Sequence, residues 1–157
     1  MSFYQLEKKQ LIPAELDKVW DFISSPENLK KITPRYMGFD MVSKNLPDKM
    51  YPGMIIRYKV KPLLGIPVTW VTEIIHVIDK KYFVDEQRIG PYSMWHHQHW
   101  LEERPGGVMM TDIVSYQPPL GFLGRIANFL FIRRQLEGIF AHRELALKSV
   151  FPQKPQE

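Results

Sequence analysis

Three of the five histidines of this 157-residue chain lie within the segment GPYSMWHHQHWLEER, between two of its four tryptophans. Imidazole can ligate a metal, act as a general acid or base near neutral pH, or orient a ligand in a pocket. Clustered histidines also occur as buried structural residues whose hydrogen bonds are satisfied. The groups that surround each histidine therefore decide which of these chemistries applies.

The segment has the composition of a β-strand, in which successive side chains point to opposite faces of the sheet. His97 and His99 then share one face with Trp95. His96 and Trp100 point the other way, where we expect them to lie outward or beneath the first helices.

A first hairpin brings an acidic group to these histidines. Gly90 and Pro91 are a turn signal between two strand-like segments. If Gln87 lies opposite Trp95, then Asp85 faces His97.

A second hairpin, with its turn at residues 105–107, brings another carboxylate. If Glu103 lies opposite Val108, then Asp112 faces His99. The two registers agree on a single face, which we predict to line a cavity under the C-terminal helix. The residues of this face are Phe83, Asp85, Gln87, Trp95, His97, His99, Asp112, Val114 and Tyr116.

Two interpretations of this face involve no chemical reaction. In a buried polar network, Asp85 and Asp112 would supply the hydrogen-bond partners of the two histidines. In a ligand site, a carbonyl, quinone or carboxylate head would accept from a histidine. The apolar body of the ligand would then lie along Trp70, Phe83 and Phe129.

Two further interpretations are reactive. An Asp paired with a His could act as acid or base in an aldol-type cyclisation, a dehydration or a hydrolysis, which makes His97, His99, Asp85 and Asp112 the catalytic candidates. The sequence shows no nucleophile with a positioned base, however. His97, His99 and Asp112 could also ligate a metal. Since nearby carboxylates more often hydrogen-bond histidines than share a metal with them, we expect no metal and no cofactor.

The rest of the chain supplies the elements that hold this face. A first strand at residues 3–12 precedes two short helices, and strand patterns then continue to residue 117. From Gly121 to about Val150 the period becomes helical. One apolar stripe is expected along this helix, formed by Phe122, Ile126, Phe129, Arg133, Leu136 and Phe140. The order predicts an α+β fold in which a curved antiparallel sheet of about six or seven strands wraps around one long helix.

Composition bounds the class of protein. Hydrophobic residues make up 45% of the chain and charged residues 24%, as in a soluble globular domain. We predict one domain over residues 1–151 and a disordered tail over residues 152–157. The absence of cysteine excludes disulfides, thiol catalysis and thiolate metal sites. The charged N-terminal residues do not form a signal peptide, so we expect a cytoplasmic protein.

The net charge of +4 falls mainly on the C-terminal helix, where residues 119–151 hold five basic and two acidic side chains. A solvated helix face explains this excess most simply. We find no nucleic-acid-binding motif and expect no nucleic-acid partner. The apolar start of the helix, GFLGRIANFLFIRR, would contact the bilayer if the protein worked at a membrane. A helix gripped by a sheet would have the same composition.

Several short motifs make the chain resemble the SRPBCC superfamily, which includes START domains, birch-pollen-allergen-like proteins and polyketide cyclase/dehydrase-like proteins. The resemblance covers roughly residues 3–150 and is greatest to a bacterial ligand-binding subgroup. The motifs are the helix start P-x-x-V-W-x-F, with Pro13 shifted, W-x-T-x-I from Trp70, F-V-D-E-Q from Phe83, G-P-Y-x-x-W-x-H-x-H from Gly90, T-D-x-V-x-Y from Thr111 and R-R-Q-L-x-x-I-F from Arg133.

This resemblance implies a helix-grip fold with a hydrophobic cavity between the curved sheet and the C-terminal helix. We expect the cavity to bind a small hydrophobic or amphipathic ligand. The alternatives are a small cyclase, dehydratase or hydrolase that uses the His/Asp cluster, and a protein that transfers lipid or quinone at a membrane surface. Fold alone does not choose between a carrier and an enzyme.

Overall fold

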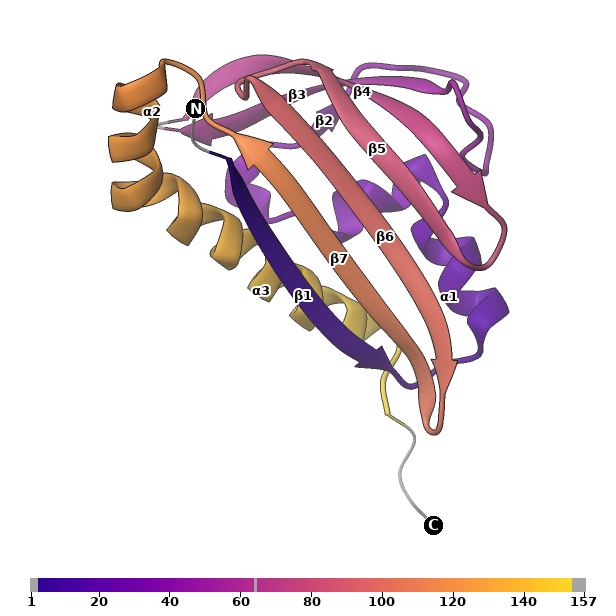
Figure 1. Ribbon diagram of the computed structural model, residues 1–157. Coiled ribbons are helices and arrows are strands. Elements are labelled where there is room, and N and C mark those ends of the chain that lie inside the picture. The colour runs from indigo at the N-terminus through magenta and orange to yellow at the C-terminus, as the bar shows by residue number, and fades with distance from the viewer. Residues whose placement is uncertain (1–2, 64, 154–157) are drawn as a thin grey trace.

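The computed structural model describes residues 3–63 and 65–153, and its sheet follows the predicted order (Figure 1). Seven antiparallel strands form one open sheet in the order β1-β7-β6-β5-β4-β3-β2. The strands are β1 (Tyr4–Ile12), β2 (Asp40–Met41), β3 (Ile55–Leu63), β4 (Ile66–Ile78), β5 (Tyr82–Ile89), β6 (Met94–Arg104) and β7 (Gly107–Gln117). Each strand from β3 to β7 pairs with its neighbour in sequence, and β1 closes the other edge against β7.

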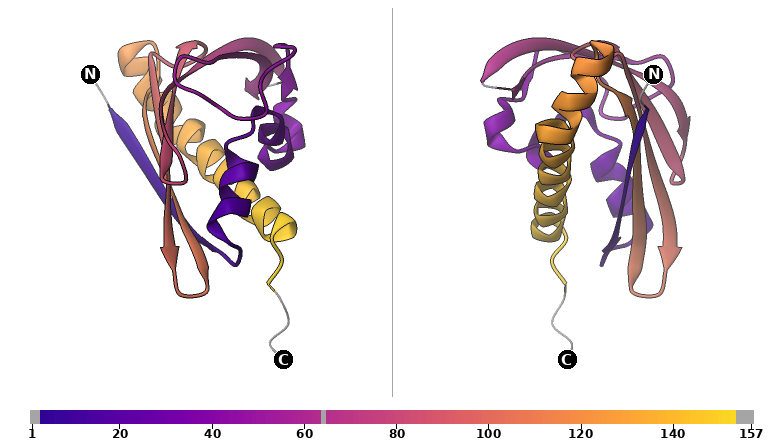
Figure 2. Two further views of the ribbon diagram at one scale, coloured as in Figure 1. Left: turned by 90° about the vertical axis from the view of Figure 1, so that its right-hand side faces the viewer. Right: turned by 60° about the vertical axis from the view of Figure 1, so that its left-hand side comes forward.

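The short helices after β1 and most of the C-terminal helix lie on one side of this sheet (Figure 2). The first group follows β1, and the second is an unbroken helical segment from residue 121 to residue 150. The helical elements are α1 (Leu16–Ile23), η1 (Pro26–Ile32), η2 (Arg35–Met37), α2 (Gly121–Ala127), η3 (Asn128–Ile132) and α3 (Arg133–Val150). The helix-grip architecture expected from the sequence is thus confirmed. Among the described residues, no helix is long and apolar enough to cross a membrane.

The two short helices predicted after the first strand are present. Helix α1 begins at Leu16. Pro26 is the first residue of η1, because the fixed φ of proline suits the first helical position. The segment is a 3-10 helix, and Ile32 and Pro26 are its buried residues.

The predicted apolar stripe of the C-terminal helix is wrong in its first half. Phe122 and Phe129 are 64% and 87% exposed, whereas Leu136 and Phe140 are 3% and 7% exposed. The cause is the π-helical turn η3, which adds a residue to one turn and so rotates the later face by roughly 100°. Helix α3 faces the sheet, whereas α2 extends past the end of β7 (Figure 1).

The largest buried cluster lies between the sheet and the first helices. Trp20 of α1 packs edge-on against Phe83 of β5, with 6.2 Å between the ring centroids. A smaller buried cluster joins β7 to the C-terminal helix through Val114, Tyr116, Leu136 and Phe140. Between these two clusters the concave face of the sheet is not filled completely, and this is where the candidate site lies.

Candidate functional site

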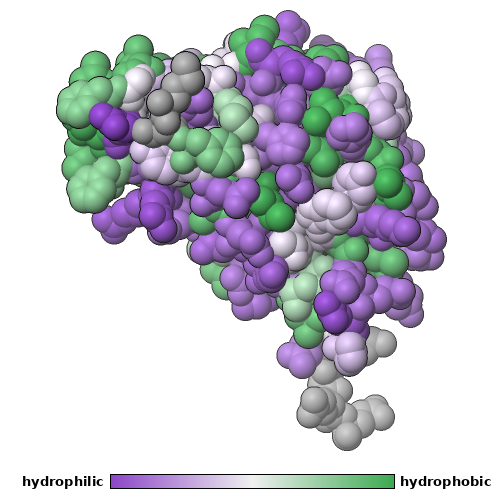
Figure 3. All heavy atoms as spheres, viewed as in Figure 1, coloured by the Kyte–Doolittle hydropathy of each residue, from purple (hydrophilic) through white to green (hydrophobic). Residues whose placement is uncertain are grey.

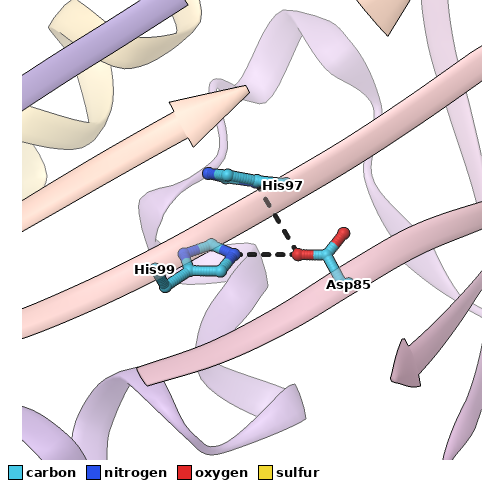
Figure 4. A group of neighbouring side chains, drawn as sticks. All are labelled: Asp85, His97 and His99. Carbon is cyan, nitrogen blue, oxygen red and sulfur yellow. Dashed lines mark hydrogen bonds and ion pairs between the residues drawn. The ribbon is translucent and has the colours of Figure 1, made fainter. Parts of the chain in front are cut away.

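Both hairpin registers predicted for the histidine strand are confirmed. In the β5–β6 ladder Asp85 pairs with His97 and Phe83 with His99. In the β6–β7 ladder Asp112 pairs with His99. The side chains of Asp85, His97 and His99 consequently meet on the concave face (Figure 4). The β6–β7 turn requires Gly107, since a Cβ there would lie 2.0 Å from the Ile12 carbonyl oxygen at a φ of +147°.

Two carboxylates hold the two imidazole rings. His99 Nε2 lies 2.8 Å from Asp85 Oδ2, and His99 Nδ1 lies 3.0 Å from Asp112 Oδ1. His97 Nε2 lies 3.0 Å from the same Asp112 oxygen. His97 Nδ1, at 3.7 Å from Asp85 Oδ2, is beyond hydrogen-bond distance. The arrangement leaves this one ring nitrogen of the pair without a close carboxylate.

Arg143 of α3 completes the cluster and was missed by the sequence analysis, which counted it with the solvated basic residues. The residue is buried, with Nη2 3.5 Å from Asp112 Oδ1 and 3.2 Å from His99 Nδ1. The signal was present in the sequence: Arg143 falls on the buried helical spacing of Leu136, Phe140 and Leu147.

Burial and charge set the protonation of the cluster. Burial, together with the neighbouring His99, lowers the pKa of His97 to about 4, so its ring is neutral at pH 7. Burial alone would raise the pKa of Asp112, but Arg143 and hydrogen bonds from both histidines hold it well below its usual range. For Asp85 too, hydrogen bonding from His99 and the charges around it outweigh burial and lower its pKa. Both carboxylates are therefore ionised at neutral pH.

A cavity of about 150 Å³ lies beside this cluster. Its wall is mainly apolar and comes from the concave face of the sheet, from η1 and from α3. Asp85, His97, His99 and Arg143 provide most of its charged or titratable groups. The site thus consists of a small apolar chamber with one polar wall.

Six of the eleven residues predicted to bind ligand lie on the cavity wall. They are Trp70, Phe83, Asp85, Trp95, His97 and His99. Trp70 and Trp95 meet edge to face with 5.3 Å between ring centroids, and His99 stacks on Phe83 at 4.0 Å. The predicted face therefore does contribute to the cavity.

The other five predicted residues lie elsewhere. Gln87 holds the β5–β6 turn by donating to the Tyr92 carbonyl oxygen at 2.7 Å, and the ladder ends one pair earlier, at Glu86 and His96. Asp112 is behind the histidines. Val114 and Tyr116 belong to the second buried cluster, where the Tyr116 hydroxyl donates to Asn128. Phe129 is on the outer surface because of the π turn.

The opposite face of β6 has no part in the site, as predicted. His96 Nδ1 lies 2.8 Å from Glu86 Oε1. Trp100 is 40% exposed and stacks on Tyr82 with 4.3 Å between ring centroids. The histidine segment is thereby divided between a cavity wall and an outer surface.

Asp85, His97 and His99 are also the residues that could hold a metal ion. One ligand atom from each lies within 4.8 Å of the others, and Asp112 would orient both rings from behind. This set differs from the alternative considered from the sequence, in which Asp112 stood in place of Asp85. In the structure Asp85 serves as the hydrogen-bond acceptor of His99.

Comparisons with known proteins place the fold. No protein-family profile and no curated protein sequence matches the chain. Among solved structures, the di-domain ARO/CYC protein BexL of the BE-7585A biosynthetic pathway matches with a TM-score of 0.72 at 16% identity, over 98% of this chain and 51% of BexL. Protein CV1439 from Chromobacterium violaceum matches with a TM-score of 0.71 at 11% identity, over 96% and 99% of the two chains.

A third likeness is to Ara h 8.0201, with a TM-score of 0.59 at 14% identity over 94% of this chain and 99% of that one. At these identities the likeness establishes the fold. The chain therefore has a helix-grip fold, which it shares with these three structures.

Proposed function

We propose that the cavity binds a small, largely apolar molecule that carries a hydroxyl group. The observation that carries the proposal is the mainly apolar cavity of about 150 Å³, on one wall of which Asp85, His97, His99 and Arg143 gather. Apolar pockets with a few convergent polar groups are the usual form of small-molecule sites.

The protonation states of the cavity-lining Asp85 and His97 favour a ligand whose head group donates a hydrogen bond. Asp85 is an ionised carboxylate and can only accept hydrogen bonds. His97 is neutral, and because its Nε2 donates to Asp112, its Nδ1 carries a lone pair on the side of Asp85. A hydroxyl can donate to either group, whereas a carboxylate head would be repelled by the ionised Asp85 and Asp112.

The volume of the cavity favours a ligand that contains a single ring. A protein cavity of about 150 Å³ accommodates benzene. Trp70, Trp95 and Phe83 offer aromatic faces and edges to such a ring. A phenol therefore satisfies both the size and the polarity of the site, and it serves as the probe for the class.

The test is a thermal denaturation series of the full chain with phenol, toluene and benzoate. Phenol should raise Tm by a few degrees at saturating concentration, toluene less, and benzoate not at all, because a ligand that binds only the folded state stabilises it. An Asp85→Asn variant, which replaces the ionised acceptor with a neutral one, should reduce the preference of phenol over toluene.

A matched pair of substitutions separates cavity binding from surface binding. Ile139 lines the cavity, so Ile139→Trp fills it and should abolish the phenol effect. Ile78 is 45% exposed on β4, so Ile78→Trp adds the same bulk outside and should leave the effect intact. Equal responses of the two variants, or no response of the unaltered chain to any probe, would reject the proposal.

A second candidate is acid–base catalysis, favoured by the juxtaposition of Asp85 and His97 on the wall. Asp85 Oδ2 and His97 Nδ1 lie 3.7 Å apart, and both residues line the cavity. Either atom could take a proton from the carbon next to a carbonyl group. Hydrogen–deuterium exchange at the methyl group of acetophenone, followed by NMR, tests this. Exchange should be faster with the unaltered chain than with His97→Gln, and equal rates would exclude the role.

A further inference from the structure

Large apolar side chains are exposed together where the C-terminal helix begins. Phe122, Leu123, Phe129 and Leu130 are each between 62% and 87% exposed. We define the α2 face as these four side chains together with those of Arg125 and Arg134. Figure 3 shows apolar surface gathered over α2 at the upper left, next to a mostly hydrophilic surface on the sheet. Contiguous apolar surface of this kind usually marks an interaction site.

The fold holds this face away from its own sheet. Pro118 and Pro119 end β7, and Leu120 and Gly121 then take left-handed backbone conformations with φ of 64° and 51°. Gly124 lies against that corner, since a Cβ there would be 2.0 Å from the Pro119 carbonyl oxygen. Helix α2 consequently projects past the sheet (Figures 1 and 2). Gripping by the sheet, which could have explained this apolar composition, applies to α3 and not to α2.

The charge around the α2 face has one sign. Residues 113–136 contain three arginines and no Asp or Glu. Arg133 is partly neutralised by Glu137, with Nε 3.3 Å from Oε1. Arg125 lies over the Phe122 ring at 5.2 Å from its centroid and keeps its guanidinium exposed beside the apolar side chains. Exposed aromatic and leucine side chains bordered by arginines match the interface of an anionic bilayer.

An apolar groove begins beneath this face. It has a volume of about 400 Å³ and is lined by Leu123 and Phe131 on the helix side and by Pro91 and Pro119 on the sheet side. Pro62, Tyr92 and Gln135 line both this groove and the cavity of the candidate site. The Gln135 amide donates to the Pro62 carbonyl oxygen where the two spaces adjoin.

From the exposure, the projection and the charge of α2 we infer that the α2 face is a docking surface for anionic membranes. Phe122, Leu123, Phe129 and Leu130 enter the boundary between head groups and acyl chains, and Arg125 and Arg134 contact the lipid phosphates. In that orientation the groove opens toward the bilayer. The docking itself does not depend on what the cavity binds.

Vesicle co-sedimentation of the full chain tests the inference. The chain should sediment with vesicles of equal parts phosphatidylcholine and phosphatidylglycerol, and much less with phosphatidylcholine alone. Phe129→Ser and Leu130→Ser should each weaken binding roughly tenfold, since each removes a large apolar side chain from the interface. Arg125→Gln and Arg134→Gln should each weaken binding to anionic vesicles by about fivefold.

Two controls match these substitutions elsewhere on the same helix. Leu145 is 65% exposed near the far end of α3, so Leu145→Ser should sediment like the unaltered chain. Lys148→Gln removes one positive charge away from the α2 face and should also have little effect. The inference is overturned if the unaltered chain sediments with neither vesicle, or if α2-face and control variants behave alike. A dimer on size exclusion that Phe129→Ser dissociates, without vesicle binding, would assign the face to a second copy instead.

Discussion

Arg143 of the C-terminal helix reaches Asp112 of β7 in the interior of the domain, with Nη2 3.5 Å from Oδ1 and side-chain exposures of 10% and 8%. Asp112 Oδ1 also lies 3.0 Å from a ring nitrogen of each cavity-lining histidine. The helix thus contributes a charge to the site as well as an apolar covering. Arg143 Nε has no acceptor among the described residues, so its contribution depends on Asp112 and His99.

Removing this arginine should destabilise the fold strongly. Arg143→Met would leave Asp112 ionised and buried without its positive partner, and breaking a buried pair in this way typically costs about 3–5 kcal/mol. Urea unfolding at pH 7 gives the change in the free energy of unfolding. The double variant with Asp112→Asn should recover a large part of the loss, because the uncompensated charge is then absent.

An exposed ion pair of the same helix provides the comparison. Lys148 Nζ lies 2.7 Å from Glu144 Oε1 at the surface, with side-chain exposures of 58% and 49%. Lys148→Met should change the free energy of unfolding by less than about 1 kcal/mol. Similar losses for Arg143→Met and Lys148→Met would show that Arg143 has no special role.

The strand pairing at the candidate site could be predicted from the sequence, but the buried face of the C-terminal helix could not. Alternation has a period of two, and turn residues fix where each hairpin reverses, so the pairing of Asp85 with His97 and of Asp112 with His99 followed directly. Which residues of the C-terminal helix face the sheet could not be predicted in the same way. A π-helical turn has no simple signature in composition, and it rotates the side chains of all later residues about the helix axis. Phe129 was thereby misplaced and Arg143 missed.

Stability should fall as the solution becomes acidic. In the unfolded chain His97 takes up a proton near pH 6.5, but in the folded chain only near pH 4, because it is buried. Between these values the unfolded state binds more protons, so the contribution is complete above about pH 6.5 and is lost progressively toward pH 4. The loss from this group is at most about 3 kcal/mol.

The titratable groups that face His97 are Asp85 on β5, His99 on β6 and Asp112 on β7, and Arg143 on α3 contacts Asp112 and His99. Urea midpoints between pH 7.5 and pH 4 should show a smaller acid loss for His97→Gln than for the unaltered chain. The two carboxylates have lowered pKa values and lose their contribution only at still lower pH. A parallel pH profile for the two proteins would contradict burial of a neutral His97.

The change of helix phase at η3 predicts opposite responses on its two sides. Leu136 is 3% exposed and lines the cavity, so Leu136→Ala should cost about 2–5 kcal/mol of unfolding free energy. Phe129 is 87% exposed, so Phe129→Ala should change it by less than about 0.5 kcal/mol. Chemical denaturation of both variants measures the contrast. A large loss for Phe129→Ala would mean that the helix keeps one phase throughout.

Two glycines of the same helical segment should respond oppositely to alanine. A Cβ on Gly124 would meet the Pro119 carbonyl oxygen at 2.0 Å, whereas a Cβ on Gly138 has only the Tyr36 hydroxyl, at 3.8 Å. Gly138→Ala should therefore stabilise the chain by roughly 0.5–1 kcal/mol, because alanine lowers the entropy of the unfolded state and nothing obstructs it. Gly124→Ala has the same intrinsic advantage but must displace α2 from the corner after β7, so it should destabilise. Thermal denaturation of the two variants decides the matter, and stabilisation by both would show that α2 is not held against Pro119.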